Sequence, residues 1–284
     1  MRIEPISLEH RTLLSSKLEA LDSCFSECTF ANVYLTRREH EHHLVFDEDK
    51  IWIRGKTRDN VTYLMPTVDL RLFSKEELLS KLNWADCFYP IPKSWKEAFD
   101  EDVFSINYNR NDSDYLFKRT KIAEYPGRNL APKRNLLKQF LKGYSATVVP
   151  YSKNGYQDAL AILDEWQSAF KDEETDYLPC RDGLEYAQEL GLIGYLVYVE
   201  ERAAALILGE ISHTRIFIIH FAKALTQYKG IYPYLFKELA SRISSQEICC
   251  LNWEQDLGNE GLRQSKLSYQ PDKIAHKLRV FKRL

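Results

Sequence analysis

The hydrophobic and polar positions of the chain follow two different periods, which predict both helices and strands. Apolar residues recur at helical spacing over 7–22 and again from Ser74, where Glu77 three positions later predicts a capping box. The segment 112–125 is also predicted to be helical. Alternating segments predict strands over 30–37, 42–56, 61–68 and 103–109, with a hairpin turn at Asp47–Asp49.

The second half shows clearer periodicity. Helical spacing predicts helices over 128–142, 155–170, 183–190 and 231–243, and a short helix after Asp256. Apolar or alternating segments predict strands over 146–152, 192–200, 203–211, 215–224, 247–252 and 276–281. A chain of 284 residues is long enough for two domains. We therefore expect domains over 1–144 and 145–284, each with helices followed by strands.

The order of elements after residue 145 resembles that of the GNAT acyltransferase fold. Three antiparallel strands are followed by a glycine-bearing turn, a helix and another strand. In the GNAT fold two central strands splay apart, and their exposed backbone groups receive an acyl donor. The turn before the helix offers backbone N–H groups to a phosphate. We therefore expect an acyl-donor cleft in the second half.

Composition narrows the choice of partners and compartment. The formal net charge of −2 argues against non-specific nucleic-acid binding by the whole surface, although a local basic cleft remains compatible with it. No apolar run approaches the roughly 18 residues of a membrane span, and the N-terminal MRIEPISLEHRTLL has no apolar signal core. We expect a cytoplasmic protein with no integral membrane segment, whose six cysteines are free thiols.

The segment QYKGIY resembles the GNAT pyrophosphate loop at Gln227 and Gly230, which are candidate phosphate-binding residues. Tyr232 departs from the small residue expected at the last position, and its bulk would crowd a pyrophosphate that enters along the backbone. An ordinary loop glycine is the alternative explanation of this match. Tyr232 counts against coenzyme A as the donor.

Two basic groups are further candidates for phosphate binding. After Asn252, Asp256 is placed to cap a short helix on which Arg263 and Lys266, three residues apart, share a face. Such a pair of cations can bind a phosphate, although an ordinary surface helix would also carry them. The second group consists of Lys133, Arg134 and Asn135 with Arg128, at the start of a predicted helix. Cations there oppose the helix dipole, which favours a bound anion, while a merely basic helix is the alternative.

Candidates for proton transfer lie on two neighbouring strands. His220, in the middle of the strand 215–224, is a candidate general base, and Glu210 on the preceding strand is an equal rival. A histidine that is satisfied within a core or cleft is the alternative. His40 and His42 could form one side of a metal site, but no third ligand is identifiable, so we expect no metal.

Several longer segments resemble the catalytic domain of bacterial phosphatidylglycerol lysyltransferases, and still more closely their small soluble relatives. These segments are GRNLAPKRNLLKQFLKGY, TDYLPCRDGLEYAQEL, QYKGIY and NWEQDLGNEGLRQSKLSYQP. The resemblance covers most of residues 115–275 and implies an α+β fold of two tandem GNAT-like domains. Each domain would have a mixed, mostly antiparallel sheet flanked by helices, with the active cleft mainly in the second. Motif residues carried over by position are Lys133, Arg134, Asn135, Gly230, Asn252, Asp256, Arg263 and Lys266; Trp253 departs from the polar residue expected in the soluble group.

The resemblance implies transfer of an activated acyl group, with aminoacyl-tRNA as the donor in the lysyltransferases and in the related Fem-type enzymes. The acceptor would be an amine or hydroxyl of a small molecule, a peptide or a lipid headgroup, and charged tRNA would be a partner. Two alternatives stay open: a coenzyme-A-dependent N-acetyltransferase that takes acyl-CoA, and a catalytically inactive binding protein on a GNAT scaffold. No tightly held cofactor is expected.

Overall fold

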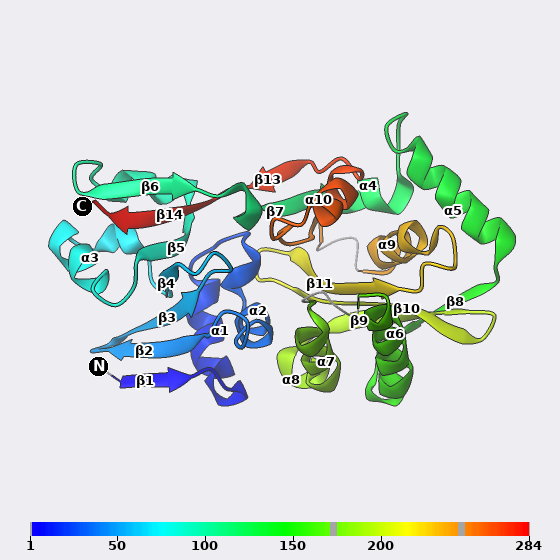
Figure 1. The fold of residues 1–284 in the computed structure, drawn as a ribbon, viewed down its shortest axis with the longest axis horizontal. Helices are drawn as coiled ribbons and strands as arrows, with labels where there is room; N and C mark the ends of the chain where they lie inside the picture. The colour runs from blue at the N-terminus through cyan, green and yellow to red at the C-terminus, as the bar shows by residue number, and fades with distance from the viewer. Residues whose placement is uncertain (1, 171–174, 244–247, 284) are drawn as a thin grey trace. The chain divides into compact units, whose positions relative to one another are not determined.

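The computed structural model of the chain describes residues 2–170, 175–243 and 248–283 (Figure 1). Its backbone contacts divide it into two compact units. The first comprises Met1–Asp114, Gln255–Asn259 and Ile274–Leu284, and the second comprises Tyr115–Glu254 and Glu260–Lys273. The expected division into 1–144 and 145–284 stays a prediction. The chain leaves the first unit after Asp114 and returns to it twice.

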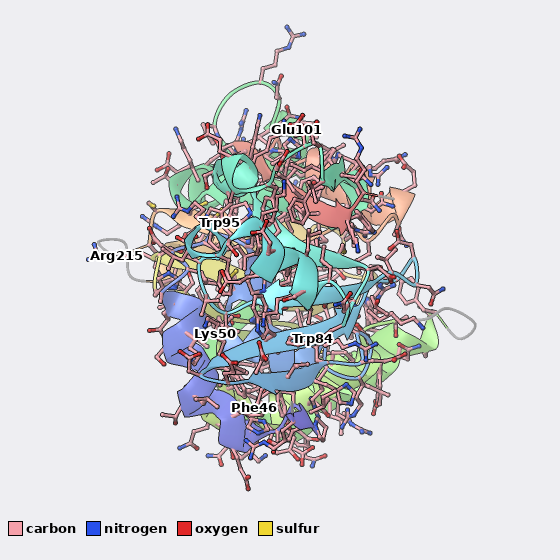
Figure 2. The ribbon with its side chains drawn as sticks, turned by 90° about the vertical axis from the view of Figure 1, so that its left-hand side faces the viewer. Phe46, Lys50, Trp84, Trp95, Glu101 and Arg215 are labelled. Atoms are coloured by element: carbon pink, nitrogen blue, oxygen red, sulfur yellow. The ribbon has the colours of Figure 1, made fainter. Side chains whose placement is uncertain are left out.

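The first unit is built on a seven-stranded sheet with the order β1-β2-β3-β4-β5-β14-β6. Its strands are β1 (Arg2–Pro5), β2 (His43–Asp47), β3 (Lys50–Lys56), β4 (Thr62–Pro66), β5 (Cys87–Pro92), β6 (Phe104–Tyr108) and β14 (Lys277–Lys282). Its helices are α1 (Arg11–Glu19), α2 (Phe30–Leu35) and α3 (Lys75–Lys81). Trp52, Phe88 and Trp95 are central to its core. Figure 2 shows this unit with its side chains, among them Trp95 and the β2–β3 hairpin residues Phe46 and Lys50.

The second unit contains another seven-stranded sheet, with the order β13-β7-β12-β11-β10-β9-β8. Its strands are β7 (Asp114–Lys118), β8 (Ala146–Pro150), β9 (Ile193–Val199), β10 (Arg202–Ile211), β11 (Ile216–Ala224), β12 (Cys250–Asn252) and β13 (Lys273–Ala275). Its helices are α4 (Arg119–Glu124), α5 (Ala131–Gly143), α6 (Tyr156–Ser168), α7 (Tyr177–Glu185), α8 (Ala187–Leu190), α9 (Ile231–Arg242) and α10 (Glu260–Leu267). In the described ranges, no helix is both long enough and apolar enough to cross a membrane.

The two sheets share one plan, which confirms the expected pseudo-repeat. From one edge, each sheet has four antiparallel neighbours, then a parallel pair, then an antiparallel sixth strand. The parallel pairs are β4 with β5 and β11 with β12. The sixth strand of the first sheet is β14, which comes after all strands of the second sheet in sequence. The sixth strand of the second sheet is β7, which directly follows β6 of the first sheet in sequence.

Most predicted elements are confirmed, including the β2–β3 hairpin and the capping box of α3. In that box Ser74 Oγ accepts from the Glu77 N–H at 3.2 Å, and Glu77 Oε2 accepts from the Ser74 N–H at 2.7 Å. Two predictions were wrong. The segment 30–37 forms helix α2, and all six of its helical residues are buried, so its pattern carries no helical period. The segment 112–125 begins with strand β7, whose first four residues are buried and therefore do not alternate.

Strands β1 and β5 were not predicted at all, because exposed charges dominate the first and prolines interrupt the second. The strand predicted over 247–252 is seen as β12; its first residue, 247, lies outside the described residues.

A buried ammonium group lies inside the first unit. The side chain of Lys277 on β14 is fully buried, and its Nζ lies 2.6 Å from Asp114 Oδ1 and 2.6 Å from Glu27 Oε2. Tyr89 donates its hydroxyl to Glu27 Oε1 at 2.8 Å, and the Ser26 N–H donates to Asp114 Oδ2 at 2.8 Å. Burial alone would lower the pKa of Lys277, but the carboxylates of Asp114 and Glu27 outweigh it and raise that pKa. The ammonium is therefore charged and fully paired.

We expect Lys277→Met to lower the free energy of unfolding by about 3–5 kcal/mol, because it leaves two carboxylates buried without their cation. Urea denaturation of the two proteins measures the difference. The matched control is Lys282→Met on the same strand, where the lysine is exposed, so the change should stay within about 0.5 kcal/mol. A loss below about 1 kcal/mol for Lys277→Met would show that the fold does not depend on this cation.

Candidate functional site

Strands β11 and β12 of the second unit part from each other as the sequence predicted. They pair in parallel only from Ile216 with Cys250 to Ile218 with Asn252. Beyond that point β11 continues along β10, while the chain after β12 turns to β7: the Trp253 N–H donates to the Tyr115 carbonyl at 2.9 Å. The two central strands therefore diverge directly after residues 218 and 252, and we call the region between their diverging ends the opening.

A β-bulge lies in β11 at the start of this opening. Leu208 of β10 is opposite Phe221, but the next residue, Gly209, is opposite Ile219, so His220 is the extra residue. A Cβ atom on Gly209 would lie 2.0 Å from the Ile218 carbonyl oxygen, so the close approach of the strands requires glycine here. Bulges interrupt the ladder and redirect a side chain. The bulge thus turns His220 toward groups outside the regular pairing.

His220 bridges two carboxylates at the mouth of the opening. Its Nδ1 lies 2.8 Å from Glu254 Oε1, and its Nε2 lies 3.0 Å from Glu210 Oε1. The imidazole is 2% exposed, whereas the side chains of Glu210 and Glu254 are 14% and 23% exposed. Fully buried Asn252 positions Glu254, because its Oδ1 accepts from the Glu254 N–H at 2.7 Å. Three side chains from β10, β11 and the end of β12 therefore form one polar cluster.

The charge of His220 limits the role that it can play. Burial alone would lower its pKa, but Glu254 and Glu210 outweigh that effect and raise the pKa to about 10. At neutral pH the ring is an imidazolium with both nitrogens donating, so it has no lone pair for a proton. Of the two predicted candidates, Glu210 is the one that can accept a proton in this arrangement. The catalytic roles of His220 and Glu210 stay predictions.

The Gly230 turn differs from a phosphate-binding loop in its surroundings. Gly230 has a φ of 92°, and a Cβ there would lie 2.2 Å from the Leu136 carbonyl oxygen of α5. The Ile231 N–H already donates to the Tyr228 carbonyl at 3.0 Å. Gln227, in contrast, is exposed, and burial raises the pKa of Tyr232 on the first turn of α9. The Leu136 carbonyl therefore lies directly against this glycine.

The predicted cations after Asn252 do not lie together on an exposed face. Lys266 is buried, and its Nζ donates to the Trp253 carbonyl at 2.5 Å. Arg263 lies 3.5 Å from Glu260 of its own helix. Asp256, in the first unit, is fully buried and accepts from the Gly258 N–H at 2.9 Å, which holds the turn before α10. The expected phosphate-binding roles of these residues stay predictions, but Lys266 already has a structural partner.

Helix α5 carries the second predicted basic group. Arg134 donates to the carbonyls of Tyr125 and Gly127, so its guanidinium stabilises the turn after α4. Lys133 is half-buried with its Nζ 3.8 Å from the centre of the Tyr269 ring, and burial lowers its pKa. Asn135 is exposed. The three residues therefore face different surroundings and do not form one cluster.

Sequence reasoning missed Glu254, although the segment NWEQ contained the signal. Asn252 ends a strand, and an Asn side chain often accepts a hydrogen bond from the backbone N–H two residues later, which here is that of Glu254. Trp253, noted as a departure, packs on Phe236 with ring centres 4.2 Å apart and on Tyr269 at 4.8 Å. A bulky aromatic residue there fills the space beside α9.

The histidine pair considered as a metal site has structural partners. His42 Nδ1 lies 2.9 Å from the Val33 carbonyl and its Nε2 lies 2.7 Å from Tyr63 Oη. Burial lowers the pKa of His42 to about 3. His40 Nδ1 lies 2.8 Å from the Lys56 carbonyl. Both rings therefore hydrogen-bond the segment just before β2 to neighbouring parts of the first unit.

The raised pKa of His220 predicts a pH-dependent stability. The folded state keeps the proton up to about pH 10, whereas an unfolded histidine loses it near pH 6.5. The stabilisation that protonated His220 contributes to the free energy of unfolding is therefore complete below pH 6.5. It is lost as the pH rises toward 10, by up to about 1.4 kcal/mol per pH unit.

Urea denaturation at several pH values measures the difference in unfolding free energy between the wild type and His220→Gln. That difference should shrink as the pH rises from 6.5 toward 10, whereas buried thiols, whose pKa values are also raised, affect both proteins alike. Parallel pH profiles for the two proteins would mean that His220 is not held as an imidazolium.

Comparison with known proteins gives both the fold and the family. A conserved protein of unknown function from Bacteroides thetaiotaomicron VPI-5482 is 24% identical with a TM-score of 0.86, covering 100% of each chain. L-PGS from Bacillus licheniformis is 16% identical with a TM-score of 0.59, covering 88% of this chain and 90% of that one. FemX is 8% identical with a TM-score of 0.63, covering 100% of this chain and 98% of the other. No curated protein matches the chain.

These structural matches confirm the predicted fold class, an α+β fold of two tandem GNAT-like domains. The family model described as phosphatidylglycerol lysyltransferase, C-terminal, matches residues 19–280. The chain therefore belongs to the phosphatidylglycerol lysyltransferase C-terminal family, as its sequence segments predicted.

Proposed function

We propose that the protein transfers an aminoacyl group from aminoacyl-tRNA to an amine or hydroxyl acceptor, with the opening between β11 and β12 as its active site. Membership of the lysyltransferase family supports the reaction class. The observation that carries the assignment to this site is the cluster of Glu210, His220 and Glu254, built on a bulge where the two strands part. Such a position offers a carboxylate that can accept a proton. It also offers irregularly paired backbone, to which the carbonyl of the acyl donor can bind.

The charges of α5 support tRNA as the donor. The helix carries Lys133, Arg134, Lys138 and Lys142 and no acidic residue. Lys138 and Lys142 are exposed and one helical turn apart. Neither is in an ion pair within the part of the chain that the structure describes. Two exposed cations on a helix without acids favour contact with a phosphate backbone, even in a chain whose net charge is −2.

The surroundings of Gly230 weigh against coenzyme A. The phosphates of acyl-CoA would need N–H donors at this turn. The Leu136 carbonyl lies against the glycine instead, and the Ile231 N–H is already bonded. A carbonyl oxygen repels a phosphate oxygen, because both are hydrogen-bond acceptors. Both contacts therefore count against the N-acetyltransferase alternative.

In the proposed reaction the acceptor nitrogen or oxygen attacks the ester carbonyl carbon of the aminoacyl-tRNA. A new C–N or C–O bond forms, the ester bond to the ribose breaks, and the proton of the acceptor passes to the ribose oxygen. Glu210 is placed to carry this proton, because one of its oxygens binds His220 and its side chain reaches solvent. His220 and Glu254 hold Glu210 in position.

Binding to tRNA is tested with Lys138→Ala/Lys142→Ala. We expect weaker binding of charged tRNA and a plot of log affinity against log salt whose slope falls by about two units, one for each lost phosphate contact. The matched control is Lys93→Ala/Lys282→Ala, which removes two exposed lysines from the first unit. A protein that binds acetyl-CoA and not tRNA would support the acetyltransferase alternative, and one that binds neither would support a binding protein on this scaffold.

Proton transfer is tested with Glu210→Gln. The amide keeps the shape of the side chain but cannot take a proton, so we expect the rate to fall by about 10²- to 10⁴-fold with tRNA affinity unchanged. Loss of radiolabelled amino acids from a mixed pool of charged tRNA, with hydroxylamine as a surrogate acceptor, measures the rate. Glu185→Gln, on exposed Glu185 of α7, is the control. An unchanged rate in Glu210→Gln would remove this residue from the mechanism.

A further inference from the structure

The turn that follows β12 bends the chain out of the sheet. Up to Asn252, β12 pairs with β11 on one side and with β7 on the other. Beyond Asn252 the pairing with β11 ends, whereas β7 stays bonded to the chain through Tyr115. This residue accepts from the Trp253 N–H at 2.9 Å and donates to the Glu254 carbonyl at 3.2 Å, so two residues face one. Such an irregularity bends a strand, and here it lies where β12 leaves β11.

The backbone of Glu254 has an unfavourable conformation at this bend. Its φ is 53°, in the left-handed region that residues with a side chain seldom adopt. An Asn side chain stabilises a local turn when it accepts from the backbone N–H two residues later. The Oδ1 of Asn252 makes this bond to the Glu254 N–H at 2.7 Å. Asn252 is fully buried, so the hydrogen bond is shielded from water.

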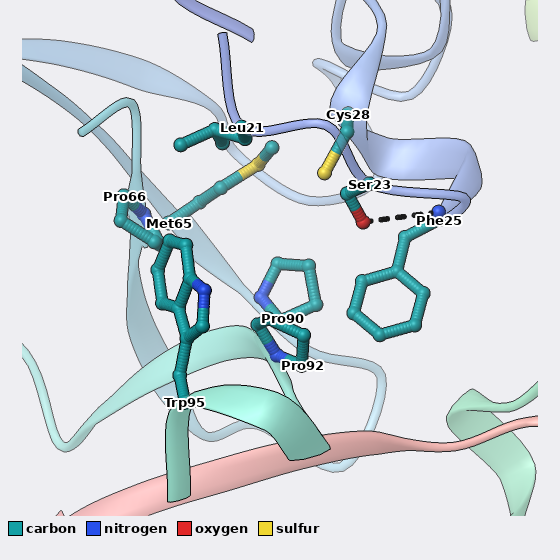
Figure 3. A pocket seen from close by; sticks show the side chains of 9 residues that line it. All are labelled: Leu21, Ser23, Phe25, Cys28, Met65, Pro66, Pro90, Pro92 and Trp95. Carbon is teal, nitrogen blue, oxygen red and sulfur yellow. Dashed lines mark hydrogen bonds between the residues drawn. The ribbon is translucent and has the colours of Figure 1, made fainter. Parts of the chain in front are cut away.

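The first unit shows that strands of this plan diverge without such a turn. The last parallel pair of β4 and β5 is Leu64 with Phe88. Phe88 therefore has the place of Asn252, and Pro90, two residues later, has the place of Glu254. Proline has no N–H for an Asn to bond and cannot take a positive φ. Pro90 lines a small apolar hollow there (Figure 3). Divergence of the strands thus does not by itself require Asn252 or a strained Glu254.

The strained turn in the second unit places a carboxylate. Glu254 Oε1 lies 2.8 Å from His220 Nδ1, and His220 Nε2 lies 3.0 Å from Glu210 Oε1. Both carboxylates raise the pKa of the buried ring and keep it protonated. A change in the turn would move Glu254 away from His220 and weaken the hold of the ring on Glu210. The turn therefore acts on Glu210 through His220.

We propose that Asn252 is a positioning residue of this site, whose hydrogen bond to the Glu254 N–H holds the strained turn and so keeps the Glu254 carboxylate on His220. Backbone strain persists only where the surroundings fix it, and it concentrates at functional sites. Here Asn252 and Tyr115 fix it. The effect on catalysis rests on the function proposed for the opening. The dependence of the ion pair between His220 and Glu254 on Asn252 does not.

Two substitutions that leave nearly the same space separate the hydrogen bond from packing. Asn252→Ala removes the acceptor, whereas Asn252→Ser supplies a hydroxyl that can accept from the same N–H more weakly. In protein labelled with ¹⁵N-histidine, we expect the pKa of His220 to fall by about 1–3 units in Asn252→Ala and by less in Asn252→Ser. His220→Gln identifies the signal. Asn154→Ala, which changes an exposed Asn of the same unit, should leave this pKa unchanged.

The transfer reaction gives a second measurement. With charged tRNA and hydroxylamine, kcat should fall by about 10- to 100-fold in Asn252→Ala, because Glu210 is displaced, while the KM for charged tRNA stays unchanged. Asn252→Ser should recover part of the lost rate. An inactive wild type would contradict the proposed function, and the titration of His220 would then decide the role of Asn252.

Glu254→Gly tests the backbone directly, since glycine adopts a positive φ without help. In urea denaturation, Asn252→Ala should destabilise this variant less than it destabilises the wild type. If Asn252→Ala alone does not fold, Glu254→Gly must restore a folded protein. Two results would overturn the proposal: an unchanged pKa of His220 in both Asn252 variants, or no relief of the Asn252→Ala defect by Glu254→Gly.

Discussion

The first unit depends on one buried ammonium group. Lys277, in the last of its three segments, binds Asp114, where the first segment ends, and Glu27. Gln255, where the chain first returns, donates its amide to the same Glu27 carboxylate. A shift of β14 by one residue would turn Lys277 to the other face of the sheet and leave both carboxylates buried without a cation. The cation therefore fixes the register of the strand that completes the sheet.

The two sheets show how one strand plan can carry different chemistry. In both, two central strands diverge after a short parallel pair. In the second unit the positions that follow are His220 and Glu254, whose side chains form an ion pair. In the first unit they are Pro66 and Pro90, which line a small apolar hollow. The fold supplies the diverging strands, and the residues at two equivalent positions decide the chemistry beside them.

The sequence predicted the fold class because local signals agreed with it: the capping box of α3, the hairpins, and the strand–turn–helix order around Gly230. It failed at α2 and β7, where burial on all sides removes the periodicity from which elements are inferred. Of the candidate site, Glu210, His220 and Asn252 were identified, since polar residues within or ending apolar strands are conspicuous. Glu254 was missed, and the sequence did not predict that the Lys266 side chain turns inward to the Trp253 carbonyl. Both depend on how the chain turns after residue 252.

The exchange of sixth strands also has a consequence for the order of folding during synthesis. All strands of the second sheet, from β7 to β13, are synthesised before β14. The N-terminal sheet therefore cannot close when its own strands emerge, and the facing edges of β5 and β6 wait for a partner while more than 160 further residues are made. The first unit is therefore begun first during synthesis but can be completed only after the strands of the second unit have been made.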